Sequence, residues 1–163
     1  MPHSIAALNQ QTLHMSVLVT PDMVNFSGHM HGGDLLKNLD RVAYACAMRY
    51  AACNVVTLSV DKVLFKQPIN IGDLITFLAS VNYTGRTSIE VGIKVIAEDL
   101  KAKSIRHTNS CYFTMVAVGE GNIPQEVPMF VPVTKEEIER HGRAKERREK
   151  SLKDGHPRPK ANV

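Results

Sequence analysis

The chain has 163 residues, of which 44% are hydrophobic and 22% charged, and its formal net charge is +4. This length and composition suit one domain with a sizeable core plus an appendage. No apolar run approaches the roughly 20 residues of a membrane span, and the N-terminus lacks the pattern of a signal peptide. We therefore expect a cytoplasmic protein without membrane insertion. With 6% aromatic residues, no tryptophan and no basic strand face, nucleic-acid binding is not expected either.

The positive charge is confined to the C-terminal part of the chain. Residues 1–134 carry ten basic and ten acidic side chains, whereas residues 135–163 carry ten basic and six acidic ones. The body is therefore neutral, and the C-terminal segment is the cationic part.

Metal and thiol chemistry are weakly indicated. Cys46, Cys53 and Cys111 lie within apolar patterns and form no C-x-x-C, which favours core packing in a reducing compartment. His29 and His31 form an H-x-H pair without a third ligand in sight, so solvent-facing or loop-bonding roles are more typical. The sequence predicts neither a metal nor a cofactor.

Five segments have the β-branched and apolar content of strands, namely 12–20, 55–69, 74–83, 88–97 and 104–118. The second and third are joined by the turn signal N-I-G-D, and the third and fourth by Gly85 and Arg86 in a tight connection. In the last segment, strict alternation would put six residues on one side: Ile105, His107, Asn109, Cys111, Phe113 and Met115. His107 is accordingly expected in the core or at an interface.

Residues 25–53 contain a polar lead-in, interrupted by Gly28, Gly32 and Gly33, and after it one long predicted helix. Helical spacing connects the apolar residues Leu35, Leu39, Val42, Cys46, Tyr50 and Cys53, and we expect a helix buried on most sides. Asp34 can supply the acid that a helix start favours.

Asp40 lies well inside this helix, where neither capping nor the helix dipole explains it. Its neighbours at helical spacing, Leu36, Ala43, Tyr44 and Ala47, make an apolar row in which desolvation would perturb the pKa of a carboxylate. Asp40 could be a catalytic group, or it could be the buried ion-pair partner of a lysine or arginine.

The order of these elements indicates an α+β fold. A single apolar helix followed only by strands must be covered by the sheet, because no second apolar helix can pack on it. An antiparallel sheet of about five strands wrapped around one long helix is the hotdog architecture. Its remaining edge and face require a second subunit, which predicts at least a dimer.

The C-terminal segment predicts a second, basic helix after a proline-rich linker. Thr134 and Glu137 have the spacing of a capping box that opens a helix through about Leu152. The cluster K-E-R-R-E-K at 145–150 suits phosphate groups. The alternative is a solvated helix with pairs such as Glu139 and Arg143.

Several motifs together carry a family resemblance. The pattern N-x-x-G-x-x-x-G-G-x-L-x-x-x-x-D from Asn25 to Asp40 resembles that of hotdog-fold acyl-CoA thioesterases, the group of YciA-like enzymes and cytosolic acyl-CoA hydrolases. VVTLSVDKVLFKQPINIGD, NYTGRTSIEVGIKV and RHTNSCYFTMVAV are similar to the same family, in the same order. The resemblance implies an acyl-CoA hydrolase domain at 1–118, a linker at 119–134 and a basic helix and tail at 135–163.

The resemblance also implies the roles of individual residues. Asp40 would be the catalytic carboxylate, acting as general base or nucleophile, and Asn25 of another subunit would orient water or the thioester. The Gly33 amide at the helix start would bind the thioester oxygen, with close approach allowed by Gly32 and Gly33. A trimer of dimers is the assembly that the resemblance suggests.

Coenzyme A phosphates have two candidate sites. One is Arg147 and Arg148 on the basic helix, and the other is Arg86 with Thr87 and Ser88 in the G-R-T-S turn. A non-catalytic acyl-CoA-binding regulator on the same fold is the alternative function, and it would make Asp40 structural. No Ser-His-Asp or Cys-His arrangement is identifiable.

Overall fold

The computed structural model describes residues 10–61 and 63–155. Residues 1–9 of the expected hydrolase domain and residues 156–163 of the expected basic helix and tail lie outside this range. The elements are β1 (Thr12–Leu18), η2 (Pro21–Met23), α1 (Gly32–Ala51), β2 (Asn54–Val60), β3 (Leu74–Thr84), β4 (Ser88–Asp99), β5 (Ser104–Val118), η3 (Glu120–Asn122) and α2 (Lys135–Lys153). Neither of the two long helices in the described chain is apolar enough to cross a membrane.

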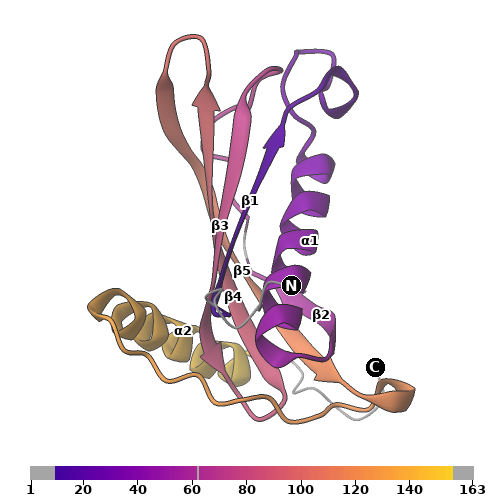
Figure 1. The fold of residues 1–163 in the computed structure, drawn as a ribbon, viewed down its shortest axis with the longest axis vertical. Coiled ribbons are helices and arrows are strands. Elements are labelled where there is room, and N and C mark those ends of the chain that lie inside the picture. Colours follow the sequence, from indigo (N-terminus) through magenta and orange to yellow (C-terminus); the bar gives the residue numbers. More distant parts are fainter. Residues whose placement is uncertain (1–9, 62, 156–163) are drawn as a thin grey trace, which may run out of the picture.

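The five strands form one antiparallel sheet in the order β1-β3-β4-β5-β2. The sheet curves, and α1 lies along one of its faces (Figure 1). Alternate residues of β4 face α1 and are almost completely buried, namely Ile89, Val91, Ile93 and Val95. This arrangement confirms the predicted hotdog fold.

Helix α1 is buried on one side only, so the prediction of a helix buried on most sides is wrong for the single chain. The buried side carries Leu35, Asn38, Leu39, Val42, Ala43, Cys46 and Ala47. The other side carries the apolar residues Leu36, Tyr44 and Met48, each 38–39% exposed. A single sheet covers one face of a helix, and the second apolar face remains available for another protein surface.

The predicted strand over 55–69 is much shorter in the structure, where β2 ends at Val60. The register of β2 on β5 shifts between Thr57 and Ser59, and after Val60 the described residues keep only isolated backbone bonds to β5. One joins the N–H of Asp61 to Tyr112 and another the N–H of Lys66 to Thr108. Pro68, which has no N–H to donate, cannot continue such a ladder.

A β-bulge in β5 also corrects the predicted alternation. Val95 pairs with Asn109 but Ile96 pairs with His107, so Thr108 is an additional residue in the strand. Asn109, Cys111, Phe113 and Met115 are buried as predicted, whereas Ile105 and His107 are exposed. The expectation that His107 lies in the core is wrong, because one extra residue turns the preceding side chains to the other face. A place at an interface, the other expectation for His107, stays a prediction.

The predicted second helix is present, with the predicted capping box. Thr134 Oγ1 accepts the N–H of Glu137, and Glu137 Oε2 accepts the N–H of Thr134. Helix α2 lies across the face of the sheet opposite to α1 (Figure 1). Its one i,i+4 ion pair among the described residues joins Arg140 to Glu136 rather than Arg143 to Glu139.

Candidate active site

Asp40 projects from the middle of α1 and is exposed in the single chain. Its Oδ1 accepts a hydrogen bond from Thr57 Oγ1 at 2.7 Å. Within the described chain no lysine or arginine forms an ion pair with it. Both the expected burial within one chain and the alternative of a buried ion pair are therefore wrong. Asp40 is instead a solvent-accessible carboxylate, oriented by a hydroxyl and flanked by the exposed apolar residues Leu36 and Tyr44.

Thr57 is a site residue that the sequence interpretation missed. It belongs to β2, opposite the buried Met115 of β5, and shares its face with the buried Val55. That face is directed toward α1. A polar residue two positions after the buried Val55, and so on the same helix-facing side of β2, was the signal that could have revealed it.

The start of α1 is open to a ligand. His31 is the N-cap residue but makes no side-chain cap hydrogen bond, so the first amides of the helix lack their usual acceptor. A Cβ on Gly33 would meet nothing within 4 Å, whereas a Cβ on Gly32 would lie 3.3 Å from the ring of Phe65. Gly33 thus leaves open space in front of the helix, and Gly32 accommodates a side chain of the same protein.

Asn25 lies in a tight turn ahead of α1. Its Oδ1 accepts the N–H groups of Ser27 and His29 at 2.9 and 3.2 Å, and its backbone N–H donates to the carbonyl of His29. Gly28 closes the turn with φ of 76°, a conformation that suits glycine. The Asn25 oxygen therefore shapes its own loop, and its Nδ2 has no partner among the described residues.

The structure does not connect Asn25 to Asp40 within one chain. No hydrogen bond joins the two side chains, although both are described. The turn that holds Asn25 lies beyond the start of α1, at the upper end of the molecule in Figure 1, and Asp40 lies two turns into the helix. Within one chain, the two predicted site residues are therefore not brought into contact with each other.

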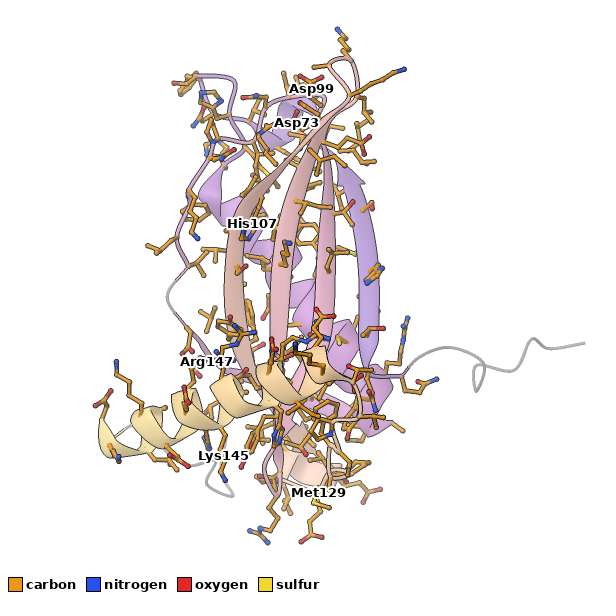
Figure 2. All side chains as sticks on the ribbon, turned by 90° about the vertical axis from the view of Figure 1, so that its left-hand side faces the viewer. Asp73, Asp99, His107, Met129, Lys145 and Arg147 are labelled. Carbon is orange, nitrogen blue, oxygen red and sulfur yellow. The ribbon has the colours of Figure 1, made fainter. Side chains whose placement is uncertain are left out.

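Arg147 anchors α2 to the outer face of the sheet. Its guanidinium donates to both carboxylate oxygens of Glu90, at 2.6 and 3.2 Å, and lies 3.5 Å over the ring of Tyr112. Burial by itself would lower the pKa of Arg147, but the hydrogen bonds and charge of Glu90 outweigh burial, and the pKa is raised. Arg147 points from α2 onto the lower part of the sheet (Figure 2).

The other predicted phosphate-binding residues converge on one pocket. It is lined by Arg86, Thr87 and Ser88 of the β3–β4 turn and by Lys145 and Arg148 of α2. A Cβ on the glycine before Arg86 would lie 2.7 Å from the Ser88 hydroxyl, so a side chain there would displace that hydroxyl. Arg86 has one weak, exposed ion pair, at 3.8 Å from Glu126.

Metal ligands do not gather anywhere in the described part of the chain. The Nδ1 of His29 lies 2.9 Å from Asn70 Oδ1, which is the loop-bonding role expected for it. The three cysteines are free thiols, and burial raises the pKa of Cys46 and of Cys111 to about 12. At neutral pH these two thiols are protonated packing groups.

Comparisons with known proteins agree with this architecture. Residues 27–103 match the family model described as the thioesterase superfamily. The VdlD protein of Helicobacter pylori is 55% identical over 146 residues, which cover 90% of this chain and 83% of that protein. A hexameric acyl-CoA thioesterase solved without ligand is 35% identical, with a TM-score of 0.85 over 90% of this chain and 94% of that one.

The acyl-CoA hydrolase of Staphylococcus aureus, solved with butyryl-CoA and coenzyme A, bears on the site itself. It is 31% identical, with a TM-score of 0.82 over 88% of this chain and 87% of that one. Variants of that enzyme carry alanine in place of an asparagine, an aspartate and a threonine that are separated by 15 and 17 residues. The same separations relate Asn25, Asp40 and Thr57. On these likenesses in sequence and fold, the chain belongs to the hotdog-fold acyl-CoA thioesterase family.

Proposed function

We propose that this protein hydrolyses acyl-CoA thioesters to a free carboxylic acid and coenzyme A. The observation that carries the proposal is the placement of Asp40, an exposed carboxylate oriented by Thr57 on the helix whose open start is Gly33. The match in spacing to the three residues replaced in the S. aureus hydrolase supports the same assignment.

Each group has a role that thioester hydrolysis requires. Attack on the carbonyl carbon places negative charge on its oxygen, and the amide of Gly33 at the positive end of α1 is a suitable donor to that oxygen. Asp40 either takes a proton from the attacking water or attacks the carbonyl itself to form a mixed anhydride. In both routes the C–S bond breaks, coenzyme A leaves as the thiol, and a water oxygen ends on the acyl carbon.

Asn25 acts in the site of a neighbouring subunit. Its free Nδ2 can donate to the water or the thioester, while the turn around its Oδ1 holds it in place. The exposed side of α1 and the outer edge of β2, which pairs with β5 alone, offer surfaces for a dimer. The hexameric assembly of the 35% identical thioesterase supports a trimer of dimers.

The pocket of Arg148, Lys145 and Arg86, with Thr87 and Ser88, binds the phosphates of coenzyme A. Guanidinium groups and hydroxyls match phosphate oxygens, and this pocket lies where α2 meets the β3–β4 turn. The sheet of one subunit lies between its α2 and its α1. A coenzyme A whose phosphates are bound at α2 of one subunit therefore presents its thioester to the α1 of another subunit. Arg147 holds α2 in place and is not itself free for phosphate.

The free thiols of the three cysteines suit a reducing compartment, and we place the protein in the cytoplasm.

The experiment that tests hydrolysis is Asp40→Asn assayed against acyl-CoAs of short, medium and long chain. Because Asn is nearly isosteric, folding and assembly should be unchanged, and kcat should fall roughly 100-fold or more with a much smaller change in KM. If the wild-type protein binds acyl-CoA but releases no thiol from any of them, the hydrolase proposal is wrong. The protein would then be a non-catalytic acyl-CoA-binding regulator.

A further inference from the structure

Phe26, the residue after Asn25, is the most exposed large hydrophobic side chain in the described part of the chain. It is nevertheless part of a well-defined turn, because the N–H of Asn25 donates to the carbonyl of His29 and the N–H of Gly28 donates to that of Asn25. A phenyl ring fully in water on an ordered turn buries none of its area in its own chain. Such a side chain is typical of a contact with something outside that chain.

The turn is also fixed to the body of the protein. The N–H of Met30 donates to the carbonyl of Ile69 at 2.8 Å, and the N–H of Ile71 donates to that of Gly28 at 3.3 Å. The His29 imidazole adds its contact with Asn70. Phe26 and Asn25 are therefore held next to each other in one fixed turn, and a surface that packs against this turn can meet both.

An exposed apolar surface surrounds Asp40 on the same chain. Leu36, Tyr44 and Met48 occupy the exposed side of α1, with Asp40 between Leu36 and Tyr44. In a dimer with two-fold symmetry, each protomer can place its Asn25 turn against the Asp40 side of its partner's α1. The symmetry makes this contact occur twice in the dimer, once at each α1. The partner then contributes an aromatic ring as well as an amide to each site.

We propose that Phe26 determines acyl-chain specificity, by forming the apolar wall against the first carbons of the chain in the partner's Asp40 site. This inference rests on the proposed hydrolysis of acyl-CoA. The acyl chain begins at the carbonyl carbon that Asp40 serves, so the apolar wall must begin next to that carboxylate. Leu36 and Tyr44 supply one side of this wall, and the partner's Phe26 supplies the other.

The absence of tryptophan from the sequence allows a direct binding test. Phe26→Trp introduces a single indole, whose emission in the assembled protein should shift to shorter wavelength when a non-hydrolysable S-dodecyl-CoA thioether binds. Coenzyme A alone should shift it much less. Met129→Trp is the matched control, because Met129 is also a large exposed hydrophobic residue. It lies at the opposite end of the sheet from Asp73, and Asp73 follows the segment at Ile71 that is bonded to the turn of Phe26 (Figure 2). Because the segment around Met129 is bonded to the Arg86 turn, the emission of the Met129→Trp variant should respond to the thioether no more than to coenzyme A alone.

Kinetics supply the second arm. Phe26→Ala should lower kcat/KM for acyl-CoAs that have several chain carbons relative to acetyl-CoA, whose acyl group offers Phe26 a single methyl group, by roughly tenfold or more, the scale of losing several apolar contacts. Phe26→Leu should recover most of the ratio. An F26W indole that is silent to the S-dodecyl thioether, or an unchanged chain-length ratio in Phe26→Ala, overturns the inference. A wild-type protein that hydrolyses nothing refutes the proposed activity instead, and the fluorescence arm still decides whether Phe26 contacts the chain.

Discussion

The hydroxyl of Thr57 donates a 2.7 Å hydrogen bond to Oδ1 of Asp40, joining the edge strand β2 to the middle of α1. Asp40 is exposed in the single chain, so its side chain would otherwise be free to occupy several rotamers. The bond occupies one carboxylate oxygen and leaves Oδ2 free. Thr57 thus acts as a positioning residue for the proposed base or nucleophile.

Replacing Thr57 by Val should remove this orientation while keeping the shape of the side chain. A hydrogen bond to a charged group contributes about 1.5–3 kcal/mol, so kcat should fall by roughly tenfold to 100-fold. KM should change little, because Thr57 does not contact coenzyme A in the proposal. Thr57→Ser keeps the hydroxyl and should retain most of the activity. Equal losses in the Val and Ser variants would show that packing of β2, not the hydroxyl, is the cause.

Mixed oligomers test whether Asn25 and Asp40 act across subunits. Asn25→Ala and Asp40→Asn should each be nearly inactive alone. In dimers formed at random from an equal mixture, half are heterodimers with one native site each, so about a quarter of all sites recover. Activity should be measured after co-refolding or co-expression of the two variants. If the mixture is no more active than the mean of its components, both residues act within one chain.

Gly33→Ala should separate catalysis from folding at the helix start. A Cβ there meets nothing within 4 Å, and alanine is favoured in helices over glycine by up to about 1 kcal/mol. The midpoint temperature of thermal unfolding should therefore be unchanged or slightly higher. The added methyl group should hinder approach of the thioester oxygen, so kcat should fall. Unchanged kcat would remove the Gly33 amide from the proposed oxyanion site.

Arg147 and Arg148 are neighbours in sequence with different expected effects. Arg147→Gln leaves the buried Glu90 without its partner, and we expect a stability loss of about 1–3 kcal/mol, discounted because Arg147 is partly exposed. Arg148→Gln should raise KM for acyl-CoA and leave stability and kcat nearly unchanged. Denaturant unfolding and steady-state kinetics of both variants measure this contrast. A stable Arg147→Gln variant with raised KM would return Arg147 to the phosphate site.

The fold was predictable because its signals are local. Helical spacing identified α1, period-2 alternation identified β4, and the Thr134–Glu137 spacing identified the start of α2. Single-residue insertions were not predictable in this way. The bulge at Thr108 changes no composition, yet it turns Ile105 and His107 outward, and the register of β2 on β5 shifts between Thr57 and Ser59 without a sequence signal.

The site was predicted in part, because its contacts lie between elements distant in sequence. Asp40 and Gly33 could be singled out by a carboxylate inside an apolar helix and by paired glycines at its start. The Thr57–Asp40 bond depends on how β2 crosses α1, and the Arg147–Glu90 pair spans 57 residues. The exposed side of α1 could not be told from its buried side, since both are apolar and a second subunit is needed to explain one of them.

The capping box of α2 predicts a pH dependence of stability. Glu137 Oε2 accepts the N–H groups of Thr134 and Val133, at 2.9 and 2.8 Å, and these bonds hold the pKa of Glu137 below its ordinary value of 4.5. A carboxylate whose pKa is lower in the folded state stabilises the protein above the unfolded-state pKa. That contribution is lost as the pH falls through the folded-state pKa.

Glu137→Gln isolates this contribution, because glutamine can still accept hydrogen bonds in a capping box but carries no charge. The free energy of unfolding of the wild type minus that of the variant should be positive above pH 4.5 and should shrink toward zero as the pH falls below it. Other carboxylates titrate in both proteins and cancel in the difference. Thr134→Ala is the matched control, since it removes the cap hydroxyl at every pH and should cost about 1 kcal/mol. A wild-type-minus-Glu137→Gln difference that stays constant from about pH 6 to about pH 3 would mean that the charge of Glu137 adds nothing to the cap.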